Sequence, residues 1–131
     1  MSTRLASCSC GQLTAQVSAD PVRISICHCL ACQRRTGGPF AEQARFPSAS
    51  VALAGKSTEF VLTGDEGSHA TFHFCPHCGA TVYYEAEGLE GFITIPVGAF
   101  ADPGFPAPNV SVYESRKHSW VVPPLGAEHY P

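Results

Sequence analysis

Phe74-Cys75-Pro76-His77-Cys78-Gly79 is the stretch that decides the fold, because its two cysteines have the spacing of a zinc knuckle. Two thiolates this close can bind one ion from a single turn of backbone, at a Zn–S distance of about 2.3 Å. The glycine after the second cysteine permits a tight turn and leaves backbone N–H groups free to point at the sulfurs. The stretch therefore predicts half of a four-cysteine zinc site.

The other half of this site is predicted near the N-terminus, at Cys8-Ser9-Cys10-Gly11, where a glycine again follows the second cysteine. Pairing Cys8 and Cys10 with Cys75 and Cys78 gives a closed set of four thiolates, which is typical of structural zinc. Such a site joins distant parts of a small protein and adds stability that a modest core lacks. The alternative is that the four are buried or redox-active thiols without a metal.

A third group of cysteines, Cys27-His28-Cys29-Leu30-Ala31-Cys32, supplies three more ligands for a second zinc ion. Three protein ligands leave one position for water or substrate, which is the arrangement of catalytic zinc. Two alternatives stay open: a redox pair at Cys29 and Cys32, or a histidine that closes the site. Exposed thiols of low pKa oxidise readily, so this second site is also expected to be found empty or oxidised where metal is lacking. The candidate closing histidines are His28, His69, His73 and His77.

Charge limits what a zinc ion in the second site can do. Three thiolates more than neutralise the dication, so it should activate water less well than zinc held by histidines. An incoming thiol suits such an ion better, because it would be held as a nucleophilic thiolate near neutral pH. The site therefore predicts thiol capture.

A basic pair and a glycine turn follow the third cysteine group. Two arginines beside an open metal can receive a ligand that carries a carboxylate. The alternative is that both arginines are solvated charges on the surface of a short helix. The candidate substrate-binding residues are Arg34, Arg35, Gly37, Gly38 and Phe40.

The rest of the chain reads as a mainly β protein with little helix. Twelve glycines and eleven prolines divide it into short segments in which apolar and polar residues alternate or β-branched and aromatic residues cluster. Gly64-Asp65-Glu66-Gly67 is a predicted hairpin turn, and one short helix is predicted over 30–35. The proline-rich stretch from 101 is expected to run extended over the surface, with Tyr113 and Trp120 packing at a lid or core edge. The predicted strands are Leu13–Ser18, Arg23–Ile26, Ala41–Phe46, Thr58–Leu62, Ala70–Phe74, Thr81–Tyr84, Phe92–Val97 and Val110–Tyr113.

Length, charge and cysteine count limit the number of domains, the partners and the cellular compartment that the sequence allows. The 131 residues suit one domain over 1–131, and a net charge of −3, from 8 basic and 11 acidic residues, offers no broad surface for nucleic acid. No membrane partner is expected, since the apolar run 92–100 is short and broken by Pro96 and Gly98. The N-terminus lacks the apolar run of a signal peptide. The seven cysteines are an odd number, which does not suit a framework of disulfide pairs. We therefore expect a reduced, cytoplasmic protein.

At its cysteine groups the sequence resembles the glutathione-dependent formaldehyde-activating enzyme (GFA) family, which includes the centromere protein V–like domain. The three groups occur in the family's order and rough spacing, and the run 95–103 and the residues Tyr113 and Trp120 also resemble it. The resemblance implies small antiparallel sheets in a β-tent-like, zinc-stapled domain. It also implies a structural ion at Cys8, Cys10, Cys75 and Cys78 and a catalytic ion at Cys27, Cys29 and Cys32. Relatives often carry a histidine where this chain has Ser111.

The resemblance also implies a reaction. Family members of the named type are carbon–sulfur lyases that join glutathione to formaldehyde and give S-(hydroxymethyl)glutathione. The expected partners are therefore glutathione or another small thiol and a small aldehyde, which agrees with thiol capture at the second zinc. The rival hypothesis is a non-catalytic zinc module that binds another protein. The two differ in whether the second site is open and lies beside a pocket.

Overall fold

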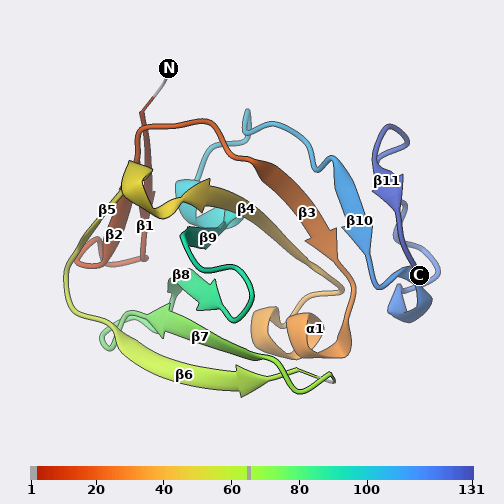
Figure 1. Ribbon diagram of the computed structural model, residues 1–131, viewed down its shortest axis with the longest axis horizontal. Coiled ribbons are helices and arrows are strands. Elements are labelled where there is room, and N and C mark those ends of the chain that lie inside the picture. Colours follow the sequence, from red (N-terminus) through yellow and green to blue (C-terminus); the bar gives the residue numbers. More distant parts are fainter. Residues whose placement is uncertain (1–2, 65) are drawn as a thin grey trace.

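The computed structural model describes residues 3–64 and 66–131 and shows a mainly β fold with two sheets (Figure 1). The smaller sheet is antiparallel, in the order β1-β2-β5. The larger sheet has eight strands in the order β11-β10-β3-β4-β9-β8-β7-β6. The small sheet contains β1 (Arg4–Ser7), β2 (Thr14–Val17) and β5 (Val51–Ala54). The large sheet contains β3 (Arg23–Cys27), β4 (Ala41–Pro47), β6 (Thr58–Thr63), β7 (His69–Phe74), β8 (Thr81–Ala86), β9 (Phe92–Pro96), β10 (Val110–Val112) and β11 (Glu128–His129).

The large sheet is mixed. Strands β3, β4 and β6 to β9 pair antiparallel, whereas β10 runs parallel to both β3 and β11. The expectation of small antiparallel sheets therefore holds for the three-stranded sheet, and the C-terminal strands add a parallel edge to the other. In Figure 1 the sheet is bent, with β10, β3 and β4 above, β8, β7 and β6 below, and the helix α1 (Leu30–Thr36) between the two parts.

All eight predicted strands and the predicted helix are present, with ends shifted by at most two residues. The hairpin between β6 and β7 is confirmed by their register and by a 3.0 Å hydrogen bond from Gly67 N to Gly64 O, although Asp65 lies outside the described residues. Strands β1, β5 and β11 and three short 3-10 helices were not predicted. The 3-10 helices are η1 (Ser48–Ser50), η2 (Val97–Phe100) and η3 (Glu114–Arg116).

One hydrophobic core connects the two sheets. Leu13 and Val17 from the small-sheet side pack with Phe46, Val82 and Ile95 from the large sheet, and all five are fully buried. Burying side chains of this size is the main favourable contribution to folding. The core also contains cysteines from both of the sequence groups that were predicted to share one metal, Cys8 and Cys75.

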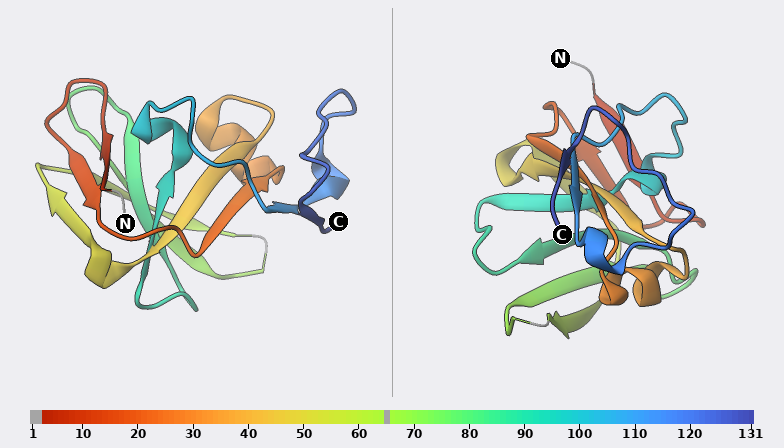
Figure 2. Two further views of the ribbon diagram at one scale, coloured as in Figure 1. Left: turned by 90° about the horizontal axis from the view of Figure 1, so that it is seen from above. Right: turned by 90° about the vertical axis from the view of Figure 1, so that its right-hand side faces the viewer.

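The C-terminal segment lies at the end of the molecule opposite to the small sheet (Figure 2). It contributes β10, η3 and β11, and elsewhere it is interrupted by turns, so it does not form the continuous extended run that was expected. Trp120 does not pack at a core edge as expected: it is 69% exposed and contacts the His118 ring edge-on, with centroids 6.1 Å apart. No helix among residues 3–64 and 66–131 is long and apolar enough to cross a membrane.

Candidate metal centres

The first cluster consists of Cys8, Cys10, Cys75 and Cys78, whose sulfur atoms all lie within 4.8 Å of one another. The Sγ atom of Cys10 is 3.6 Å from the Sγ atoms of both Cys8 and Cys75. Four sulfurs around one zinc ion at tetrahedral angles would stand about 3.8 Å apart. The donor set and its spacing therefore fit a zinc ion, and the pairing predicted from the sequence is the one the fold brings together.

Two glycine turns shape this cluster. Gly11 and Gly79 both have positive φ, +87° and +79°, a conformation that glycine adopts without steric cost. Each turn is closed by a hydrogen bond back to a cysteine carbonyl, from Gly11 N to Cys8 O at 3.2 Å and from Gly79 N to Cys75 O at 2.8 Å. The two halves of the site are thus built alike, as the repeated cysteine–glycine pattern predicted.

Backbone and side-chain donors point at the sulfurs of the first cluster. Leu13 N donates to Cys8 Sγ at 3.3 Å, and His77 N donates to Cys75 Sγ at 3.4 Å. The side-chain amide of Gln12 donates to the same Cys75 sulfur at 3.0 Å. Burial acts to raise the pKa of Cys75, but the hydrogen bond from Gln12 and those from the backbone lower it to about 6. These donors stabilise the thiolate form that a metal requires.

Gln12 was not among the predicted site residues, and it holds the first cluster against a neighbouring loop. Its amide donates to Lys56 O at 2.7 Å and accepts from Lys56 N at 2.9 Å, while also contacting Cys75. The loop approaches closely: a Cβ added at Gly55 would lie 1.9 Å from Gln12 O, and Gly55 has a φ of +96°. Only the adjacency of Gln12 to Cys10-Gly11 hinted at this role.

The second cluster consists of Cys27, Cys29 and Cys32, whose sulfur atoms also lie within 4.8 Å of one another. Cys27 ends β3, Cys29 caps the N-terminus of α1, and Cys32 lies in the first turn of that helix. The cap is made by sulfur, because Cys32 N donates to Cys29 Sγ at 3.3 Å. The strand end and the helix start therefore aim three thiols at one point.

The pKa values of the thiols in the second cluster are shifted in opposite directions. Hydrogen bonds from Cys27 and then Cys32 lower the pKa of Cys29 far below its usual value. The same hydrogen bonds, from Cys29 and Cys32, raise the pKa of Cys27, and burial adds to this effect. Cys29 is therefore the first thiolate to form, which is the state that metal binding or oxidation needs.

Among the described residues, no fourth cysteine, histidine or carboxylate joins the second cluster. His28 is fully buried and its Nε2 atom lies 3.1 Å from Ser111 Oγ. His73 Nε2 lies 2.9 Å from a carboxylate oxygen of Glu85, and His69 Nδ1 lies 2.9 Å from Thr63 Oγ1. His77 lies in the turn of the first cluster. The closing histidine that the sequence left possible is therefore absent from the described geometry.

The predicted substrate-binding residues lie in different surroundings. Arg34 is exposed, as expected of a solvated surface charge, and Gly37 ends α1 with a φ of +74°. Arg35 is half-buried, with its guanidinium 4.5 Å from the centre of the Phe72 ring, and its charge favours the thiolate of Cys32. Gly38, the next residue after Gly37, is half-buried. The ring of Phe40 lies 6.1 Å from that of His28, measured between centroids.

An apolar hollow of about 590 Å³ lies between α1 and the strands β6, β7 and β8 of the large sheet. Arg34 and Arg35 are its charged lining, and none of the cysteines lines it. Arg35 is the link between the hollow and the second cluster, since it lines the hollow and acts electrostatically on Cys32. The hollow is lined by Leu30, Ala31, Arg34, Arg35, Phe60, Leu62, Phe72, Phe74 and Thr81.

Fold and site together define a class: small, mainly β proteins in which one four-cysteine and one three-cysteine cluster can each hold a metal ion. The chain belongs to the glutathione-dependent formaldehyde-activating enzyme family, whose sequence profile it matches over residues 3–116. A crystal structure of a Rhodobacter sphaeroides protein has the same fold, with a TM-score of 0.58 and 18% identity over 97% of this chain and 99% of the other. A comparison with curated proteins finds no significant match.

Proposed function

We propose that the chain binds zinc at both clusters and uses the second to capture a small thiol, such as glutathione, and add it to a small aldehyde such as formaldehyde. The observation that carries this proposal is the set of three converging sulfurs that no fourth ligand from the described residues completes. Membership of the family supports the choice of thiol and aldehyde. The proposed class of enzyme is a carbon–sulfur lyase, and the proposed location is the cytoplasm.

The first cluster would be the structural zinc site. All four of its sulfurs come from the chain, so no position is left for a substrate. It joins the loop between β1 and β2 to the turn between β7 and β8, at the edge of the hydrophobic core. Its proposed contribution is stability.

The second cluster would hold the zinc ion that acts in the reaction. When bound there, zinc would supply a site at which a thiol loses its proton near neutral pH. Cys27 is buried at a strand end, and the start of α1 orients Cys29 and Cys32, so the chain contributes a rigid set of three ligands. Arg35 adds positive charge beside this set, which favours an anionic sulfur.

The proposed reaction is an addition and needs no oxidant or reductant. The sulfur of the thiol forms a bond to the aldehyde carbon, and the π electron pair of the carbonyl moves to its oxygen. The proton that left the thiol ends on that oxygen, and the product is a hydroxymethyl thioether. Burial raises the pKa of Tyr84, so its phenol stays protonated and can donate a hydrogen bond beside the second cluster.

A non-catalytic protein-binding role is the second candidate, and the apolar hollow favours it. Phe60, which lines the hollow, is 59% exposed, and its neighbour Val61 is 54% exposed. Apolar surface of this kind is typical of interaction sites. This role needs no thiol chemistry, so measurements on the second cluster separate the two candidates.

The test compares Cys29→Ser with Cys78→Ser after reconstitution with cobalt, whose visible absorption reports thiolate ligands. The wild type should bind two ions per chain, and glutathione should change the spectrum of one of them. Cys29→Ser should keep one ion and a folded core but lose the response to glutathione. Cys78→Ser should instead lose thermal stability.

Catalysis is measured separately by NMR exchange between free formaldehyde and its glutathione adduct. The wild type should accelerate this exchange, and Cys29→Ser should not. A wild type that binds two ions but neither responds to glutathione nor accelerates exchange would exclude the enzyme and leave the binding role.

A further inference from the structure

Two arginines face each other across the middle of the large sheet without an acidic partner. Arg23 on β3 pairs in register with Arg45 on β4, and the Nε atoms of both are buried with no hydrogen-bond partner. None of the ion pairs formed by the described residues includes either arginine. Like charges directly opposite one another destabilise a sheet. The pair is therefore poorly explained as a support of the fold.

A small cavity of about 60 Å³ lies between these side chains, which we name the arginine cavity. Its lining is polar apart from Leu89, and the Oε1 atom of Gln43 in that lining is also buried without a partner. Burial, together with the charge of Arg23, lowers the pKa of Arg45, as expected where cations are gathered without a counter-ion. The lining residues are Arg23, Ser25, Gln43, Arg45, Tyr84, Leu89 and Thr94.

The chemistry of the arginine cavity suits a carboxylate. Guanidinium groups bind carboxylates through two parallel hydrogen bonds, and the charge would neutralise the repulsion between the arginines. The amide of Gln43 can turn to present its NH₂ group to an oxygen, because its two ends are interchangeable in shape. The volume admits a single acidic group but no larger part of a peptide. Arg23, Gln43 and Arg45 are half-buried, so this face of the sheet is not sealed.

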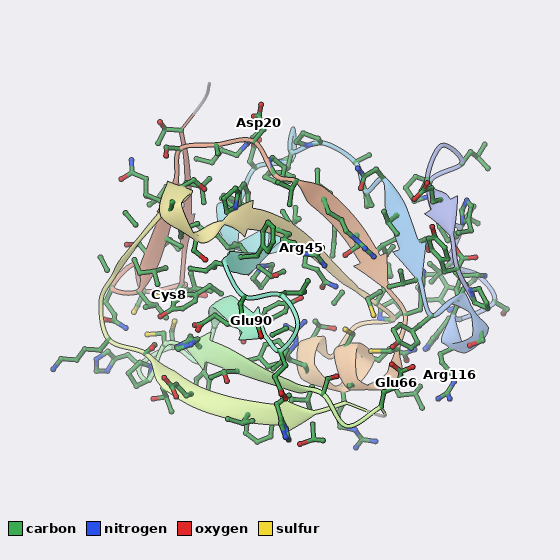
Figure 3. All side chains as sticks on the ribbon, viewed as in Figure 1. Cys8, Asp20, Arg45, Glu66, Glu90 and Arg116 are labelled. Atoms are coloured by element: carbon green, nitrogen blue, oxygen red, sulfur yellow. The ribbon has the colours of Figure 1, made fainter. Side chains whose placement is uncertain are left out.

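The arginine cavity and the second cluster lie on the same face of the sheet. Side chains alternate along a strand, so Arg23 and Cys27, four residues apart on β3, project on one side. Their backbones are about 13 Å apart, and the length of an arginine side chain shortens the gap that a ligand must span. Tyr84 lies between them electrostatically, because the charges of Arg35, Cys32, Cys27 and Arg45 all act on its phenol. In Figure 3 the label of Arg45 lies just below β4, on the side of the lower part of the bent sheet.

We propose that the arginine cavity binds a carboxylate of the thiol captured at the second cluster, so that the protein selects acidic thiols over neutral ones. This inference rests on the proposed function, since it requires thiol capture. It assigns Arg45 and Arg23 a positioning role: they hold the far end of the substrate while its sulfur is held at the cysteines. It also explains why two half-buried arginines lie side by side on the sheet without an acidic partner.

The test uses the cobalt-reconstituted protein and three probes: glutathione, its diethyl ester, and the neutral thiol 2-mercaptoethanol. Arg45→Gln should weaken glutathione binding about 10- to 100-fold, the range for a lost hydrogen bond to a charged group. Its binding of 2-mercaptoethanol should not change. The ester, which lacks free carboxylates, should bind the wild type about as weakly as glutathione binds Arg45→Gln. Binding of the ester to Arg45→Gln should be no weaker than its binding to the wild type.

Two controls separate this role from a structural one. Arg116→Gln removes an exposed arginine on η3, far from Arg45 in Figure 3, and should leave the affinity for all three probes unchanged. Arg45→Gln should leave the melting temperature unchanged or raise it, because it removes a like-charge repulsion. A structural arginine would instead lower the melting temperature and affect all probes alike.

Each remaining outcome has a distinct meaning. If Arg45→Gln weakens the binding of both thiols equally, or of neither, the carboxylate pocket is refuted while thiol capture stands. If the wild type responds to neither thiol, the proposed function itself has failed and the inference fails with it.

Discussion

Replacing Gly55 by alanine is expected to destabilise the protein well beyond the ordinary effect of adding one methyl group. The new Cβ would lie 1.9 Å from the backbone oxygen of Gln12, a distance that no packed pair of atoms tolerates. Because the clash is with backbone and not with a flexible side chain, the loop must move away from Gln12. That movement breaks the two hydrogen bonds between the Gln12 amide and Lys56.

The magnitude follows from three contributions. A left-handed conformation costs a non-glycine residue about 1–2 kcal/mol, and Gly55 has a φ of +96°. Each of the two broken hydrogen bonds contributes about 1 kcal/mol. The expected loss is therefore about 3–4 kcal/mol. For a chain of 131 residues this lowers the melting temperature by about 10–15 °C.

Gly88→Ala is the matched control. Gly88 has a similar φ of +81°, but a Cβ there would meet no atom within 4 Å. It should cost only the conformational part, about 1–2 kcal/mol. Circular dichroism melts of both variants at saturating zinc give the comparison. Equal losses in the two variants would show that the close approach to Gln12 does not matter, and the reasoning would be refuted.

Three further perturbations test other parts of the structure. Gln12→Ala should weaken metal binding at the first cluster about 10- to 100-fold, with the second unaffected, in a chelator competition assay; equal affinities would deny the amide its role. Hydrogen bonds from Ser111 and then His129 lower the pKa of Glu114, so its stabilising effect is complete above the ordinary value of 4.5 and is lost as the pH falls through the lowered pKa. Glu114→Gln should flatten that part of the pH–stability profile, measured by urea unfolding; an unchanged profile would contradict this assignment. Phe46→Ala should cost about 3–5 kcal/mol in the same assay, since Phe46 is fully buried against Phe100; a loss below about 1 kcal/mol would mean that the core closes over the gap.

The two cysteine clusters could be predicted from the sequence because cysteines close together in the chain are also close together in space. Two thiols within a turn of backbone, followed by a glycine, have few other arrangements, so the pairing of Cys8 and Cys10 with Cys75 and Cys78 followed from number and spacing. The long alternating strands were equally readable. Strand β5 was not, because most of its residues are exposed and no buried face marks it. Strand β1 has a single buried residue and β11 has none, so neither shows an alternation of buried and exposed residues.

The residues around the clusters could not be read in the same way. Arg23 and Arg45 stand 22 positions apart, and only the register of β3 against β4 makes them neighbours. Gln12 reaches Cys75 across 63 positions of the chain. Trp120 seemed a packing residue by its size, yet the irregular C-terminal path leaves it in solvent. Long-range pairing decides these contacts, and a single sequence carries no period or motif that encodes it.

The two clusters differ in how far apart their ligands lie along the chain, and this gives them different parts in folding. The second cluster takes its three thiols from six consecutive residues, so only the local turn from β3 into α1 is needed to bring them together. The first cluster joins Cys10 to Cys75 across 65 positions. Closing a loop of that length removes about 4 kcal/mol of chain entropy from the unfolded state, by analogy with a disulfide. If metal binds as proposed, an ion at the first cluster would act as a cross-link between distant parts of the chain, whereas an ion at the second would constrain only a short local segment.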